Sequence, residues 1–139
     1  MFAFFDHTGD VGVELRSDSL PGLFADAARA LAATLSDAAD LQPVRTLRVS
    51  LRHETLDLLL VDWLSELLYR FEVEGFLPAE ADVLVERADG GWALAAEVRG
   101  EPDAAARVPI KVLVKAVTYH ALLVEREGEA WVGRVVFDI

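Results

Sequence analysis

The stretch LDLLLVDWLSELLYRF, residues Leu56–Phe71, decides the fold because its apolar residues recur every three or four positions along its whole length. That period is typical of an α-helix with one apolar face. A stripe of this kind is far more often a core face than a cofactor-binding surface, so we interpret Trp63 and the leucines as packing residues. Gly75 supplies a stop signal. The sequence therefore predicts one long helix whose apolar side must be covered by other elements.

A second helix is predicted upstream, between Ser19 and Ser36. Its apolar residues also recur every three or four positions. Ser19 suits the N-cap, and Pro21 falls in the first turn, where its missing N–H costs nothing. We expect this helix to fade near Ser36 and Asp37, because residues that break helices follow.

Strands are predicted in the remaining segments, in which apolar residues run together or alternate with polar ones. These segments are Phe2–Phe5, Val11–Leu15, Val44–Arg52, Ala79–Arg87, Trp92–Val98, Ile110–Tyr119, Leu122–Arg126 and Trp131–Phe137. The run Ile110–Val117 is apolar on both faces, so we expect it at the centre of the sheet. This order of elements predicts an α+β fold: residues 1–139 form a single domain, with two main helices packed on a largely antiparallel β-sheet.

Acidic residues dominate the charge of the chain: 24 of them against 13 basic residues leave a net charge of −11. Such a chain repels a phosphate backbone unless its cations are gathered on one face, and here the arginines are scattered singly. We therefore expect no tight direct binding to RNA. A partner with a basic surface, or a cation, is the better electrostatic match.

The chain contains no cysteine, which excludes disulfides, zinc thiolate sites, iron–sulfur clusters and thiol catalysis. Any metal must be held by oxygen or imidazole. There is no run of about 18 apolar residues to span a bilayer, and no basic region precedes the short apolar run at the N-terminus. We therefore expect no membrane association and a cytoplasmic location.

The polar stretch Asp6–Asp10 lies between the first two predicted strands and contains two carboxylates, an imidazole and a hydroxyl. An elbow held between two buried strands presents its side chains from a rigid base, which is how loops often carry function. The simpler alternative is a turn in which Asp6 and Thr8 bond their own backbone and Gly9 takes a positive φ. Taken by itself, the stretch favours the simple turn.

A second polar cluster is Lys115–His120, in which Lys115 interrupts an apolar strand. An unpaired ammonium is too costly to bury, so Lys115 either pairs with an aspartate of the elbow or reaches solvent at the strand end. The sequence leaves these two alternatives open. His120 on its own is more typical of a hydrogen-bonded structural histidine than of a ligand.

A third cluster closes the chain, where Asp138 precedes the terminal carboxylate of Ile139. Together they form an oxygen site for a hard cation if a third carboxylate, from Asp6 or Asp10, converges on them. An exposed aspartate without a role is the default. The chain has no glycine-rich phosphate loop, no G-x-S-x-G elbow and no H-E-x-x-H helix, which disfavours a standard nucleotide-binding or hydrolase fold.

Taken together, four motifs resemble those of the archease family. They are Asp6–Asp10, Trp63–Tyr69 in the long helix, Lys115–His120 and the final Phe137–Ile139. Each motif is weak singly, but four in the same order across nearly the whole chain are specific. Gly9 stands where the family more often has alanine, and Ser65 where asparagine is common; neither falls on a candidate ligand.

The resemblance implies a small α+β protein that assists an RtcB-type RNA ligase in tRNA splicing and repair without being the ligase. It implies promotion of guanylylation of the ligase's active-site histidine, multiple turnover, and broader nucleotide use by the ligase. It also implies a cation site on Asp10, Asp138 and Ile139, with Ca²⁺ as the usual occupant and Mg²⁺ or Mn²⁺ as substitutes. Further candidates for partner contact or activation are Asp6, His7, Lys115 and His120.

The alternative, from another functional class, is a metal-dependent hydrolase of a phosphoester or nucleotide. It would use His7 or His120 as general base with a carboxylate-held Mg²⁺ or Mn²⁺. Turnover of a nucleotide or phosphoester panel by the pure protein separates the two hypotheses, because an activator predicts none.

Overall fold

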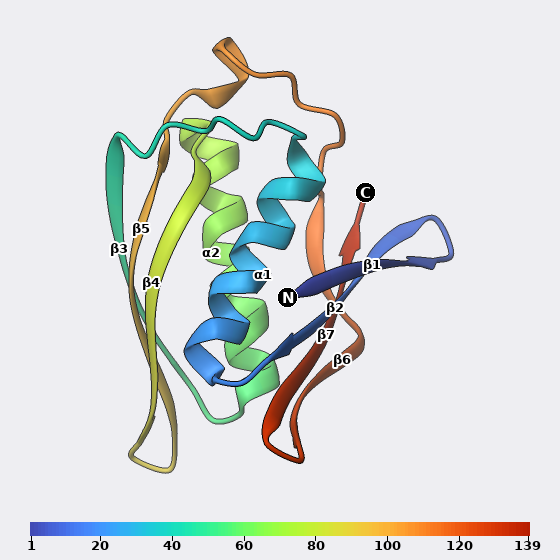
Figure 1. The fold of residues 1–139 in the computed structure, drawn as a ribbon, viewed down its shortest axis with the longest axis vertical. Coiled ribbons are helices and arrows are strands. Elements are labelled where there is room, and N and C mark those ends of the chain that lie inside the picture. Colours follow the sequence, from blue (N-terminus) through green and yellow to red (C-terminus); the bar gives the residue numbers. More distant parts are fainter.

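Two antiparallel sheets enclose two helices in the computed structural model, which describes residues 1–139 (Figure 1). The four-stranded sheet has the order β1-β2-β7-β6, and the three-stranded sheet has the order β3-β5-β4. The elements are β1 (Phe2–His7), β2 (Asp10–Ser17), α1 (Leu20–Leu35), β3 (Arg45–His53), α2 (Leu56–Glu74), β4 (Leu77–Ala88), β5 (Gly91–Glu101), the short 3₁₀ turn η1 (Ala104–Ala106), β6 (Ala116–Glu127) and β7 (Ala130–Asp138). The four-stranded sheet therefore joins the first two strands of the chain to the last two.

Both helices form where the apolar periodicity predicts them, with the predicted caps. At the start of α1, the Ser19 Oγ accepts a hydrogen bond from the Gly22 N–H at 3.1 Å. At the end of α2, Gly75 adopts a left-handed conformation with φ of 66° and donates its N–H to the Phe71 carbonyl at 2.8 Å. The two helix predictions are confirmed. Both helices are too short or too polar to traverse a lipid bilayer.

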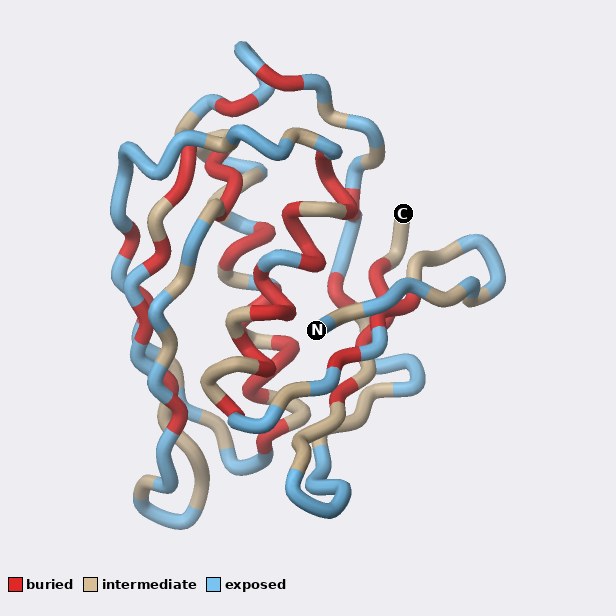
Figure 2. Tube along the Cα trace, viewed as in Figure 1, coloured by how far each residue is buried: buried red, intermediate tan, exposed pale blue.

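The core lies between the two sheets and around the helices, where 32 buried residues form one hydrophobic cluster (Figure 2). Trp63 of α2 is fully buried, and its Nε1–H donates to the Phe24 carbonyl of α1 at 2.9 Å. This bond satisfies the one polar atom of the indole and joins the two helices. Trp63 is a packing residue, as predicted.

The α+β class is confirmed, with the strands divided between two sheets instead of one. The reason lies in the helices, whose buried residues are not confined to a single stripe. In α1, Ala27, Ala28, Ala30 and Leu31 are all buried, so more than one side of the helix is covered. A helix that is apolar around most of its circumference can pack against a sheet on each side. Figure 1 shows both helices in this position.

The predicted central strand Ile110–Tyr119 is wrong in both extent and position. β6 begins only at Ala116 and is an edge strand that pairs with β7 alone. The preceding residues run irregularly past the end of α1, where the Lys111 N–H donates to the Leu35 carbonyl at 2.9 Å and Val114 is buried. The apolar residues of this segment therefore cover the end of a helix and do not form a central strand.

The first hairpin joins β1 to β2 through Thr8 and Gly9, which both have positive φ. The φ of 82° at Gly9 suits a residue without a Cβ atom. β1 is an edge strand, and Phe4 within it is 48% exposed. The polar elbow is therefore not held between two buried strands, as we had expected, but at the tip of a hairpin with one free edge.

Candidate functional site

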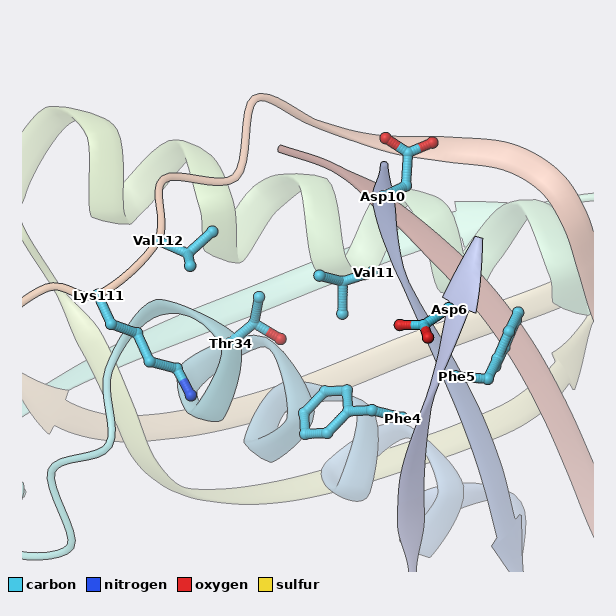
Figure 3. A pocket seen from close by; sticks show the side chains of 8 residues that line it. All are labelled: Phe4, Phe5, Asp6, Asp10, Val11, Thr34, Lys111 and Val112. Atoms are coloured by element: carbon cyan, nitrogen blue, oxygen red, sulfur yellow. The ribbon is translucent and has the colours of Figure 1, made fainter. Parts of the chain in front are cut away.

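Strand alternation places the polar residues of the first hairpin on two faces of the four-stranded sheet. In the register of β1 and β2, Asp6 pairs with Val11 and His7 pairs with Asp10. Val11 packs against the core, so Asp6 lies on the inward side, whereas His7 and Asp10 lie on the outward side. Figure 3 shows the Asp10 carboxylate pointing away from Phe4 and the other inward residues. The predicted elbow residues therefore belong to two different surfaces.

The outward side brings Asp10 beside Asp138. Val11 of β2 pairs with Phe137 of β7, so the next register position sets Asp10 against Asp138 where both strands end. Because Val11 and Phe137 pack in the core, the two neighbouring aspartates point outward. We call Asp10 and Asp138 the carboxylate pair. The two aspartates singled out from distant parts of the sequence are thus neighbours in the fold.

The donors at the carboxylate pair suit a hard cation. No three Asp, Glu or His side chains gather closely enough to hold a metal by themselves, so a third protein donor would come from the main chain. Ile139 follows Asp138, and its side chain packs against the core, which restrains its main-chain oxygens. Carboxylate and main-chain oxygens are the ligands that Ca²⁺ prefers. The donor types at the pair are therefore those that calcium sites use, and the two side chains alone do not complete such a site.

His7 and His120 meet on this face although they come from the two opposite edge strands of the sheet. Their ring centroids are 5.7 Å apart. His7 Nδ1 lies 3.7 Å from Asp10 Oδ2, is shielded from solvent, and has no hydrogen-bond partner. His120 lies in a stretch of β6 where the register with β7 shifts, between Thr118 and Leu123. A bulge of this kind re-aims a side chain, which the sequence did not indicate.

Lys115 is joined to Asp138 by a hydrogen bond between their main chains. Its N–H donates to the Asp138 carbonyl at 2.7 Å, whereas its exposed ammonium forms no ion pair. The sequence left two alternatives open for Lys115, and in the structure its side chain reaches solvent instead of pairing with an aspartate. Its ammonium is therefore free to meet an anionic group supplied from outside the chain.

The inward side of the hairpin forms a cavity of about 350 Å³ that the sequence did not predict (Figure 3). We call it the hairpin pocket, and its lining residues are Phe4, Phe5, Asp6, Asp10, Val11, Thr34, Lys111 and Val112. Asp10 is shared with the outward side, toward which its carboxylate points. The spacing of Phe4 and Asp6, two residues apart in a strand, was the one signal available in the sequence. Thr34 and Val112 come from α1 and from the irregular segment before β6, which only the folded chain brings together.

Comparisons with known proteins agree on one family. A family model described as "Archease protein family (MTH1598/TM1083)" matches residues 2–139. Among curated proteins, the chain is 34% identical over 134 residues to "Protein archease" of Methanopyrus kandleri, a match that covers 96% of each chain. It is 36% identical over 138 residues to "Protein archease" of Archaeoglobus fulgidus, covering 99% of this chain and 98% of that protein.

Two solved structures are similar to this fold. The solution structure of protein 1598 of Methanobacterium thermoautotrophicum has a TM-score of 0.87 and 30% sequence identity, and the match covers 99% of this chain and 98% of that one. The crystal structure of an archease from Thermotoga maritima, described as a possible chaperone, has a TM-score of 0.64 and covers 97% of this chain and 94% of that one. At 20% identity, the second likeness shows the fold alone.

Proposed function

This chain belongs to the archease family, and from that premise we propose that it activates an RtcB-type RNA ligase without being an enzyme itself. In this role it promotes guanylylation of the ligase's active-site histidine, sustains multiple turnover, and broadens the nucleotides that the ligase uses in tRNA splicing and repair. The observation that supports the proposal best is the carboxylate pair, because it puts Asp10 and Asp138 side by side on an outward face.

The cation proposed for this site is Ca²⁺, with Mg²⁺ or Mn²⁺ as substitutes, held by Asp10, Asp138 and a main-chain or terminal oxygen of Ile139. When bound, such a cation supplies positive charge that can stabilise phosphate oxygens. The chain's own residues orient the donors. Pairing of β2 with β7 sets the spacing of the two carboxylates, and the Lys115 N–H fixes the main chain of Asp138 through its carbonyl.

Charge supports a protein partner over a nucleic acid. A protein that binds RNA is expected to carry a basic surface, and a chain with a net charge of −11 is attracted to such a surface. The hydrolase alternative gains no support from the family or from the relatives, and nothing in the arrangement of His7 and His120 favours it. We therefore retain the activator alone.

The test is single-turnover guanylylation of the ligase from the same organism, with GTP and with the protein or its variants added. Asp10→Asn and Asp138→Asn keep the side-chain volume and remove the charge, so each is expected to reduce the rate gain at least about tenfold, as loss of a charged group that acts on the transition state commonly does. Lys115→Met is expected to weaken activation less. The control Glu129→Gln removes one exposed charge at the other end of β7 and should activate like the wild type.

Activation by Asp10→Asn and Asp138→Asn equal to that of the wild type would show that the activating surface lies elsewhere. Incubation of the protein alone with nucleotides and phosphoesters is run in parallel. If the protein alone turns over one of these compounds and Asp10→Asn does not, the protein is an enzyme and the activator proposal is wrong.

A further inference from the structure

We propose that the hairpin pocket binds an arginine side chain presented by a basic segment of a partner protein. This inference rests on the proposed function only in naming the RtcB-type ligase as the protein that supplies the arginine. The chemistry of the guest follows from three parts of the pocket: a carboxylate, an aromatic face and an apolar wall.

The carboxylate is that of Asp6, which is exposed and forms no ion pair or hydrogen bond within the chain. The ammonium on the same pocket wall belongs to Lys111, and it is already paired, with its Nζ 2.6 Å from Asp37 Oδ1. Figure 3 shows the Asp6 carboxylate on the inward side of the hairpin, toward Val11. A cation entering the pocket therefore meets an unneutralised carboxylate, and the one ammonium nearby is compensated.

The aromatic face is that of Phe4, whose position on β1 two residues before Asp6 puts both side chains on the same face. Phe4 is 48% exposed, so a guest can reach it. Phe2 supports it from one side in an edge-to-face contact with ring centroids 5.5 Å apart. A guanidinium can stack on such a ring while it pairs with a neighbouring carboxylate.

The remaining wall combines the apolar side chains of Val11 and Val112 with the hydroxyl of Thr34 (Figure 3). Thr34 Oγ1 donates its proton to the Ala30 carbonyl at 2.8 Å, so its oxygen keeps lone pairs that can accept a hydrogen bond. The methylene stem of an arginine suits the apolar part of this wall. A volume of about 350 Å³ has room for one long side chain.

An arginine fits these walls better than a nucleotide or a lysine. The net charge of −11 repels phosphates and attracts a basic segment. A guanidinium offers five donors in a plane that a carboxylate can accept in pairs, whereas an ammonium is a compact point charge that stacks less well. β1 pairs only with β2, so no further strand of the sheet lies beside it, and Phe4 and Asp6 on it are exposed.

The first experiment measures by calorimetry the dissociation constant of the protein with the ligase from the same organism. Asp6→Asn is expected to weaken binding at least about 30-fold, because it leaves the partner's guanidinium without its counter-charge. Phe4→Leu keeps an apolar side chain and removes the ring, and it is expected to weaken binding about fivefold. The control Glu129→Gln, which also removes one negative charge, should stay within about twofold of the wild type. Circular dichroism confirms that each variant is folded.

The second experiment needs no ligase. The ¹⁵N-labelled protein is titrated with N-acetyl-arginine methylamide, with the matching lysine compound, and with guanosine monophosphate. The arginine probe is expected to shift the amide signals of Phe4, Asp6 and Val112 and to bind at least about threefold more tightly than the lysine probe, because only a guanidinium can pair and stack together. Asp6→Asn should abolish these shifts.

The two experiments fail separately. If the arginine probe shifts the signals but the wild type does not bind the ligase, the pocket is supported as an arginine site and the proposed function is overturned. Ligase binding that is equally strong in Asp6→Asn would overturn the pocket and leave the activator intact. Shifts with guanosine monophosphate but not with the arginine probe would overturn the proposal and make the pocket a nucleotide site.

Discussion

At the scale of single residues, the cation site proposed at Asp10 and Asp138 has a consequence for the stability of the protein without metal. Their carboxylates occupy neighbouring positions on adjacent strands, where like charges are destabilising. Asp10→Asn or Asp138→Asn removes this repulsion at nearly constant volume, so each metal-free variant is expected to melt about 1–3 °C higher than the metal-free wild type. Added Ca²⁺ should raise the melting temperature of the wild type by mass action, and that of the variants much less.

Differential scanning calorimetry of protein stripped with chelator, with and without added calcium, measures both effects. Glu129→Gln is the matched control and should keep the full response to calcium. If the two aspartate variants respond to calcium like the wild type, the carboxylate pair is not the site.

Ala121 is a second informative residue, because its φ of 52° lies in a region that alanine rarely adopts. It follows His120 directly, within the bulge of β6. Ala121→Gly should stabilise the protein by about 0.5–1 kcal/mol, since glycine occupies this region without a Cβ clash. Urea unfolding measures the change. Ala130→Gly in β7, where the strand is regular, should destabilise the protein instead. If both variants change the stability in the same direction, the backbone at Ala121 is not strained.

At the scale of elements, an ion-pair cluster fastens the loop after β5. Arg107 forms two short hydrogen bonds with the Glu101 carboxylate, at 2.6 and 2.8 Å, and a third with the Asp40 carboxylate at 3.0 Å. Arg107 first, and then the N–H of Gln42, lower the pKa of Glu101 from 4.5 to about 2. The loop that carries η1 is thereby tied to the segment that follows α1.

This lowered pKa predicts a dependence of stability on pH. A carboxyl whose pKa is lower in the folded protein contributes stability that is complete above its unfolded pKa and is lost as pH falls through its folded pKa. The wild type should therefore exceed Glu101→Gln in melting temperature above pH 5, and the gap should close between about pH 4.5 and pH 2. Thermal melts across this range test it; a gap that does not change with pH would exclude the carboxylate as its source.

Elements that depend on local pattern were predictable, and those that depend on distant contacts were not. The periodicity of α2 and the stop at Gly75 are properties of consecutive residues, and both appear in the fold. The run Ile110–Val117 failed because an apolar segment has the same composition whether it lies in a central strand or covers the end of a helix. Sequence alone cannot distinguish these two uses.

The candidate site follows the same division. The resemblance to the family singled out Asp10 and Asp138, and the register of β2 with β7 makes them neighbours. The meeting of His7 with His120 depends on a bulge, and the hairpin pocket depends on three segments that are far apart in the chain. No local pattern encodes contacts of this kind.

At the scale of the whole molecule, nearly all cationic side chains already contact an acidic or aromatic side chain of the same chain. Nine of the arginines form ion pairs with acidic residues. The other two, Arg87 and Arg126, lie over the rings of Trp92 and Trp131. Among the lysines, Lys111 is paired, which leaves Lys115. A phosphate backbone would therefore meet a net charge of −11 and only three positive side chains without an acidic partner: Arg87, Arg126 and Lys115.

Filter binding of single-stranded and hairpin RNA at low salt should accordingly detect no submicromolar complex with this protein alone, because binding of this kind depends on phosphate contacts by lysine and arginine. Low salt is the most permissive condition, since counterion release then favours binding most. Salt-sensitive submicromolar binding would show that the protein handles RNA directly.

The strand order of the four-stranded sheet also has a consequence for folding during synthesis. β2 must find β7, which leaves the ribosome nearly a whole chain length later, so the sheet has contacts between residues that are very distant in sequence. Such contacts are slow to form. The apolar face of the first hairpin therefore stays uncovered until later parts of the chain have been made. Asp10 and Asp138 can become neighbours only after β7 has been made. A nascent or prematurely released chain therefore carries only one member of the carboxylate pair, so the calcium binding proposed for that pair is expected only once synthesis is complete.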